Sequence, residues 1–498
     1  MTLLAQVGSV VGALGLAALL LCTVRWQRLA GLVAWGVGVG AVDLSLLPDL
    51  SVAKLVAAGV GGLAVAVAGA AVLVRWPYAL AFASLACVPA RVPVDLGDEQ
   101  ANLLIPLYGV VVAFALSLGW KLLNGDHRSR ELGRLALPLA AVVVWNGLAL
   151  TWSSDVNKGS IFMAAFVLPF GLLAVGFARL PWRGRWLAWL WAAVVGTALA
   201  YAAVGGYQWI TRDVFWNPSV IVFNAYAPFF RVNSIFWDPS VYGRYLAVAL
   251  LATLAGILLG GIRGKRLMVL YAVVVATWLG LYISFSQSSY AALAVGIVVA
   301  AAVTWGRRAL IGLPVLALVA VGLLVAVPSV RHELVDKSKS GVTKVTGGRY
   351  PLINRGLDIW GDAPVWGAGA GAFGREYAAR TGAQGRDPKR VQSHTTPITV
   401  AAETGVVGLA LWLWLLGVAL WTTLRGLGTG FTSRVSLAVG VLLSAIAVHS
   451  LFYASFFEDP MTWALFGLVG LAARVPKKPA PRPDYARAVD GEGQETSP

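Results

Sequence analysis

Four apolar runs, each long enough to cross a bilayer, constrain this chain more than any other feature of its sequence. They cover residues 3–24, 55–74, 309–327 and 398–421. A helix needs roughly 20 mainly apolar residues to cross a hydrocarbon core about 30 Å thick. Only 12% of the 498 residues are charged, whereas soluble proteins carry roughly 25%. The sequence therefore predicts an all-α protein, built as a polytopic transmembrane helical bundle.

The remaining apolar runs predict a bundle of about 12–15 spans. The run at residues 76–90 is short, so we expect it to be tilted or re-entrant. We expect residues 1–476 to form one membrane domain, and residues 477–498, rich in Pro and charge, to form a disordered cytoplasmic tail. The fifteen candidate runs lie near residues 3–24, 29–47, 55–74, 76–90, 103–120, 135–152, 160–178, 186–208, 245–261, 267–285, 289–306, 309–327, 397–421, 435–454 and 460–474.

Basic residues in alternate connections predict the orientation of the bundle. Short cytoplasmic loops are enriched in Lys and Arg, and this pattern puts the N-terminus outside and the C-terminus inside. Two long loops, residues 209–244 and 328–396, then face outward, and the second contains helical stretches such as residues 349–360. The cytoplasmic connections are those that carry Arg25 and Arg28, Arg75, Lys121 to Arg134, Arg179 to Arg185, Arg263 to Arg266, Arg307 and Arg308, and Arg425 and Arg434.

The formal net charge of +16 does not indicate a nucleic-acid partner, because the basic residues are scattered between apolar runs. The loop at residues 328–396 has more basic than acidic residues. Such a surface attracts anions. Two interpretations stay open: a solvated face beside anionic membrane lipid, or a site for a phosphate-bearing lipid, to which Arg gives bidentate contacts.

Two residues at the end of this loop are candidates for chemistry. His394 lies at the predicted membrane boundary, and its imidazole is suited to proton transfer. Glu403 follows inside an apolar run, where an ionisable residue is a functional candidate by default. A lone loop histidine more often has no such role. Glu403 could orient His394 or stabilise local packing.

Residues 369–374 spell GxGxxG but do not predict a nucleotide site. No hydrophobic strand precedes them, as a dinucleotide fingerprint requires. We expect a tight turn that lets the backbone approach the end of a span or a ligand.

Three segments, in this order, resemble the O-antigen ligase and O-antigen polymerase-like family of bacterial membrane glycosyltransferases. Residues 231–240 are similar to an Arg, an aromatic stretch and Asn/Asp-Pro ahead of a span. Residues 348–373 are similar to an Arg, a helix and Pro-x-x-Gly-x-Gly-x-x-Phe. Residues 393–408 are similar to a His, spaced apolar residues and Glu-x-Gly-x-x-Gly. The resemblance covers roughly residues 140–470.

The resemblance implies transfer of a glycan from a polyprenyl-pyrophosphate carrier to a hydroxyl of a glycan or glycolipid acceptor. It implies a multi-pass protein of the bacterial cytoplasmic (inner) membrane with an extracytoplasmic active face. Arg349 and Arg231 would stabilise the pyrophosphate leaving group, with Arg355 as a further candidate. His394 would be the general base, and Asp238 and Glu403 would help to bind substrate. Direct displacement would invert the anomeric centre without a metal or another cofactor.

Two other functions are compatible with the sequence. A polysaccharide or lipid-linked glycan transporter would have no transferase activity, although transporters often show internal repeats and none is visible here. A metal-dependent glycosyltransferase would use carboxylates of the first outer loop, where Asp43 and Asp49 lie without tight pairing. Activity in the presence of a chelator would distinguish this reading from a metal-independent transferase.

Overall fold

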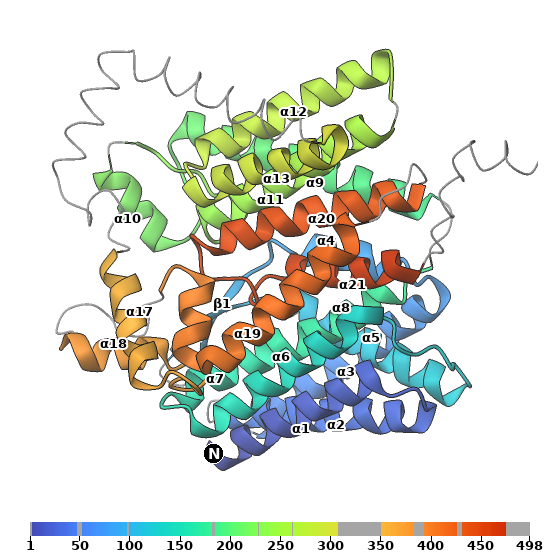
Figure 1. Ribbon diagram of the computed structural model, residues 1–498, viewed down its shortest axis with the longest axis vertical. Coiled ribbons are helices and arrows are strands. Elements are labelled where there is room, and N and C mark those ends of the chain that lie inside the picture. Colours follow the sequence, from blue (N-terminus) through green and yellow to red (C-terminus); the bar gives the residue numbers. More distant parts are fainter. Residues whose placement is uncertain are drawn as a thin grey trace, which may run out of the picture.

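The computed structural model describes residues 2–46, 52–96, 99–181, 185–227, 229–260, 262–306, 350–382, 393–425 and 431–474. Eleven helices in these ranges are long and apolar enough to cross a membrane. They lie side by side and run from one end of the molecule to the other (Figure 1). The all-α, polytopic class is therefore confirmed. The predicted run at residues 309–327 and the predicted tail at residues 477–498 lie outside the described residues.

The first part of the chain consists of helices and one short hairpin. Its elements are α1 (Thr2–Leu21), α2 (Arg25–Leu46), α3 (Val52–Arg75), α4 (Ala79–Cys87), β1 (Val92–Leu96), β2 (Glu99–Leu103), α5 (Ile105–Leu123), α6 (Ala136–Ala149) with 3-10 turns at Gly133–Leu135 and Leu150–Trp152, α7 (Val156–Phe162), a π-helical turn (Met163–Val167) and α8 (Leu168–Ala178).

The second part adds the remaining long helices and three short ones. Its elements are α9 (Trp186–Thr211), α10 (Pro218–Tyr226), α11 (Pro239–Gly260), α12 (Lys265–Ile283), α13 (Gln287–Trp305), α17 (Tyr350–Asp362), α18 (Phe373–Thr381), α19 (Thr396–Leu424), α20 (Phe431–Ser450) and α21 (Pro460–Arg474). The helical stretch expected at residues 349–360 corresponds to α17.

The short run predicted at residues 76–90 forms only the nine-residue helix α4. At about 1.5 Å per residue, such a helix is too short to cross the hydrocarbon core. The chain continues into an antiparallel hairpin in which Val92 of β1 faces Leu103 of β2. No apolar or alternating pattern in the sequence had indicated these strands.

Among the spans that the structure describes, the one formed by α7, the π-helical turn and α8 is the most enclosed, since 94% of its most apolar window is buried inside the protein. It packs against α1, α5 and α21. Single π-helical turns often occur near functional sites. This turn contributes Phe166 to the cavity described below.

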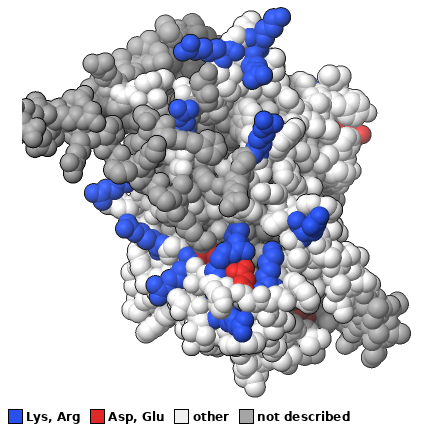
Figure 2. Space-filling model, turned by 90° about the vertical axis from the view of Figure 1, so that its right-hand side faces the viewer, with Lys and Arg blue, Asp and Glu red and all other residues white. Residues whose placement is uncertain are grey.

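A buried ionic cluster ties together three of the connections predicted to be cytoplasmic. Arg28 at the start of α2 pairs with Glu131 at 2.6 Å. Arg179, which follows α8, pairs with both Glu131 and Asp126. These connections share the right-hand end in Figure 1, and that face shows many more basic than acidic side chains (Figure 2). The arrangement agrees with the predicted alternation of loops.

Candidate active site

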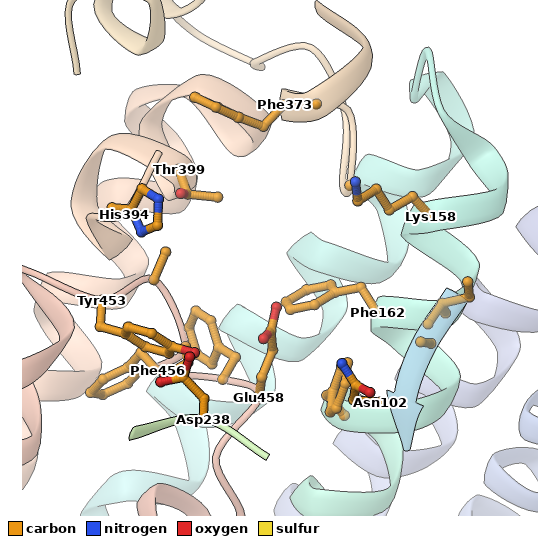
Figure 3. Close-up of a pocket in the computed structure, with 18 of the residues that line it drawn as sticks. Asn102, Lys158, Phe162, Asp238, Phe373, His394, Thr399, Tyr453, Phe456 and Glu458 are labelled. Atoms are coloured by element: carbon orange, nitrogen blue, oxygen red, sulfur yellow. The ribbon is translucent and has the colours of Figure 1, made fainter. Parts of the chain in front are cut away.

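A cavity of about 1070 Å³ lies toward the opposite end of the bundle, on the side of α10, α17 and α18. Its volume is at the upper end of typical ligand pockets, roughly 300–1,000 Å³. Its walls come from segments far apart in sequence (Figure 3). Polar and charged residues that line it are Arg91, Asn102, Asn146, Lys158, Asn217, Ser219, Asp238, His394, Thr396, Thr399, Glu403, Thr404, Tyr453, Ser455 and Glu458.

His394 lies on the cavity wall directly before α19. Its φ of 58° is in the left-handed region, which few non-glycine residues adopt. The buried hydroxyl of Ser393 donates to the carbonyl of Thr395 at 2.8 Å and accepts from its amide at 3.1 Å, so the turn around His394 is fixed. The imidazole and Thr399 lie together on one wall (Figure 3).

The glycine-rich turn at residues 369–374 (the glycine motif) and the residues just before it pack their backbone against a kink in α19. Gly405 interrupts the helix with a φ of 66°, and a Cβ there would overlap the carbonyl oxygen of Val365. The amide of Val406 instead donates to the carbonyl of Pro364 at 2.8 Å, and the amide of Gly369 donates to the carbonyl of Glu403 at the same distance. The expected tight turn against the end of a span is confirmed.

Glu403 holds this turn in place through its side chain. Its Oε2 accepts from the amide of Gly371 at 3.0 Å, and its Oε1 accepts from the amide of Phe373 at 3.2 Å. Phe373 begins α18, so the carboxylate satisfies amides at a helix N-terminus. Of the two roles considered for Glu403, these contacts support local packing. Glu403 also lines the cavity.

Asp238 has a comparable double position. It precedes α11, and its Oδ1 accepts from the amide of Ser240 at 2.6 Å, as an N-cap residue does. Its side chain also lines the cavity beside Tyr453 (Figure 3). The structure thus brings together His394, Asp238 and Glu403 from the sequence-predicted set.

The three predicted arginines have different outcomes. Arg231 is half-buried behind α10, where its Nε donates to the carbonyl of Ser284 at 3.2 Å and its guanidinium faces the ring of Phe223. It is not among the residues that line the cavity. Arg355 is exposed on α17 and pairs with Asp358 at 3.0 Å. Arg349 lies outside the described residues. Contact of these arginines with substrate stays a prediction.

The sequence analysis did not identify the charged residues on the other side of the cavity. Lys158 of α7 lies across from His394, and Glu458, which precedes α21, directs its carboxylate into the space between the walls (Figure 3). Arg91, from the connection between α4 and β1, donates to the backbone carbonyl of Glu458 at 3.2 Å.

Solvent reaches Glu458 only through the cavity. Its side chain is partly accessible because it forms a cavity wall, yet protein surrounds it on all sides. Burial therefore raises the pKa of Glu458 above its ordinary value, although the positive charges of Arg91, Lys158 and Arg244 oppose the shift. Perturbed carboxyl groups in a cavity are typical of functional sites.

Among the described residues, no group of three or more His, Cys, Asp or Glu side chains could hold a metal ion. Asp49, one of the two carboxylates considered for a metal-dependent enzyme, lies outside the described residues.

The apolar helices define a multi-pass membrane protein, and His394 and the glycine-rich turn at residues 369–374 line its cavity. Residues 272–413 match the family described as O-antigen ligase, and this match supports the resemblance to an O-antigen ligase-like family and a membrane glycan-transfer function. The match includes α17, α18 and the first part of α19, hence the glycine motif, His394 and Glu403. No curated protein matched the chain.

Proposed function

We propose that this protein is an inverting, metal-independent glycosyltransferase of the bacterial cytoplasmic membrane that works at its extracytoplasmic face. The donor is a glycan on a polyprenyl-pyrophosphate carrier, and the acceptor is a hydroxyl of a second glycan or a glycolipid. The observation that carries the proposal is the cavity wall formed by Gly371, His394 and Glu403, which all lie within the residues that match the O-antigen ligase family.

In the proposed step, the acceptor hydroxyl oxygen attacks the anomeric carbon of the donor sugar. The bond from that carbon to the pyrophosphate oxygen breaks, and the electron pair leaves with the carrier pyrophosphate. The hydroxyl proton passes to the imidazole of His394, which acts as general base. Attack opposite the leaving group inverts the anomeric centre.

The pyrophosphate carries the charge that develops as the bond breaks, so fixed cations must face it. Arg349 and Arg231 are the proposed ligands, and Arg355 is a further candidate. Arginine suits this role because its planar guanidinium makes paired hydrogen bonds to phosphate oxygens. Glu403 and Asp238 position the walls of the cavity through the helix-capping contacts described above.

The test is an assay with purified full-length protein in lipid nanodiscs. The donor is the lipid-linked glycan extracted from producing cells that lack this gene, and the glycolipid fraction of the same cells is the acceptor. We expect the glycan to appear on the acceptor, with equal rates in buffer and in EDTA. A ladder of repeats would indicate a polymerase, whereas a single shift would indicate a ligase. Loss of transfer in EDTA would overturn the metal-independent mechanism.

A transporter of lipid-linked glycans is the alternative. It would move the same donor across the membrane of proteoliposomes without forming a product. Movement of intact donor combined with no transfer, at protein amounts that give saturating donor binding, would replace the transferase proposal with this function.

A further inference from the structure

The wall opposite His394 has features that the family match does not explain. Arg91 and Asn102 come from the α4–β1 connection and from β2, while Lys158 comes from α7 and Glu458 from the segment before α21. All four lie outside residues 272–413, which match the family. Figure 3 shows Asn102, Lys158 and Glu458 around the same space.

Three polar groups on this wall, from Glu458, Arg91 and Asn102, have no hydrogen-bond partner among the described residues. Within the described part of the chain, the carboxylate of Glu458 makes no hydrogen bond, although Arg91 contacts its backbone carbonyl. In the same described ranges, Arg91 Nε and Asn102 Oδ1 are buried without a hydrogen-bond partner. An unsatisfied buried polar group costs about 1–3 kcal/mol, and each one calls for an explanation.

Aromatic residues accompany these polar groups. Phe162 of α7 lies next to Glu458 in Figure 3, and Phe166, Trp237 and Phe456 also line the cavity. Aromatic faces carry a partial negative charge, against which the C–H groups of a sugar ring pack. A carboxylate accepts hydrogen bonds only, through two oxygens, and so complements neighbouring sugar hydroxyls. A sugar ring has both C–H faces that pack on aromatic rings and hydroxyl groups that donate hydrogen bonds.

We infer that this wall binds the sugar of the acceptor, and that the Glu458 carboxylate accepts hydrogen bonds from its hydroxyl groups while Asn102 and Lys158 contact its other polar atoms. This inference rests on the proposed function and deepens it. The acceptor sugar then lies between Glu458 and His394, with one hydroxyl directed at the imidazole. Glu458 is a substrate-binding residue in this arrangement, and it takes no part in proton transfer.

The test compares initial rates of wild type and Glu458→Gln in the nanodisc assay, varying the acceptor at fixed donor and then the reverse. The acceptors are the glycolipid fraction and the pyrophosphate-free glycan released from the donor lipid by mild acid. We expect Glu458→Gln to raise the acceptor KM about tenfold or more, as the loss of a charged hydrogen bond does, and to leave the donor KM within about twofold.

The matched control is Glu376→Gln. It removes a carboxylate of α18 that pairs with Arg380 and does not line the cavity, so both KM values should be unchanged. An unchanged acceptor KM in Glu458→Gln, or an equal rise in both KM values, overturns the inference. If the wild-type protein itself transfers nothing, the proposed function has failed instead.

A second measurement uses only wild-type protein, so it does not depend on how well the variant folds. Dicyclohexylcarbodiimide reacts with buried carboxyl groups, and mass spectrometry locates the adduct. The pyrophosphate-free glycan should protect Glu458 from this reagent in a concentration-dependent manner. Equal modification with and without the glycan would overturn the inference.

Discussion

At the scale of single residues, the cavity combines carboxylates that cap backbone amides with side chains that face the open space. Glu403 and Asp238 accept hydrogen bonds from backbone amides, so they shape the walls. His394 and Glu458 project into the cavity from opposite directions (Figure 3). Substitutions in these two groups should therefore affect the protein in different ways.

His394→Ala and Arg349→Ala should abolish glycan transfer while expression and membrane insertion persist. The first removes the proposed base and the second removes a proposed pyrophosphate ligand. Arg349→Lys should also be strongly impaired, because a point charge cannot reproduce the paired hydrogen bonds of a guanidinium. Product formation by equal amounts of purified variants measures the effect. Wild-type rates in both alanine variants would remove these residues from the site.

The raised pKa of Glu458 predicts a pH dependence of acceptor binding. When ionised, the carboxylate accepts hydrogen bonds at both oxygens, whereas protonation removes the charge and turns one oxygen into a donor. The acceptor KM should therefore rise as pH falls through a pKa above the ordinary glutamate value of 4.5. Glu458→Gln should abolish this dependence. Charged and titratable groups that act on Glu458 or lie near it in the cavity are Arg91, Lys158, Arg244, Tyr453, Asp238, His394 and Asp459. A wild-type profile identical to that of Glu458→Gln would contradict the prediction.

At the scale of elements, the cavity depends on contacts between loops and broken helices. Gly405→Ala should disrupt the junction of α19 with the glycine motif, because φ is positive there and a Cβ would overlap Val365. We expect loss of transfer together with a lower unfolding temperature in detergent. Gly417→Ala, in the same helix with open space around it, is the control and should resemble wild type. Normal activity of Gly405→Ala would show that the kink is dispensable.

The ionic cluster at the other end gives a prediction for stability alone. Glu131→Ala leaves the buried guanidinium groups of Arg28 and Arg179 without this carboxylate. Breaking a buried pair in this way costs roughly 3–5 kcal/mol, so the thermal unfolding midpoint should fall by several degrees. Arg134→Ala, an exposed residue of the same connection, should leave it unchanged. Equal midpoints for the two variants would contradict this role of the cluster.

Many of the helices could be predicted, because the hydropathy of a short stretch of sequence is enough to identify a membrane span. The positions of His394 and of the tight turn at residues 369–374 also followed from local sequence. Arg91, Lys158 and Glu458 did not, because they converge only through packing between segments that no local pattern connects. The hairpin of β1 and β2 was missed for a similar reason, since its pairing depends on contacts across a turn. Arg231 was predicted from a motif alone; its guanidinium contacts Ser284 and Phe223, and its contact with substrate stays a prediction.

At the scale of the whole molecule, the basic end and the cavity end of the bundle should face opposite sides of the membrane. In a background with Cys22→Ala and Cys87→Ala, a cysteine at Asn354 of α17 should react with an impermeant maleimide in intact cells. A cysteine at His127, exposed between α5 and α6, should react only after the membrane is opened. The reverse pattern would place the cavity on the cytoplasmic side.

The origin of the cavity walls also limits how this protein can be recombined with relatives. The hairpin of β1 and β2 supplies one wall from a region that precedes the matched segment. In a chimera that exchanges only residues 272–413, the cavity wall with His394 would come from the relative, whereas the wall formed by the β1–β2 hairpin would come from this protein. Crossover points that keep both walls from one parent, upstream of Ala79 and downstream of Glu458, would preserve the shape of the chamber.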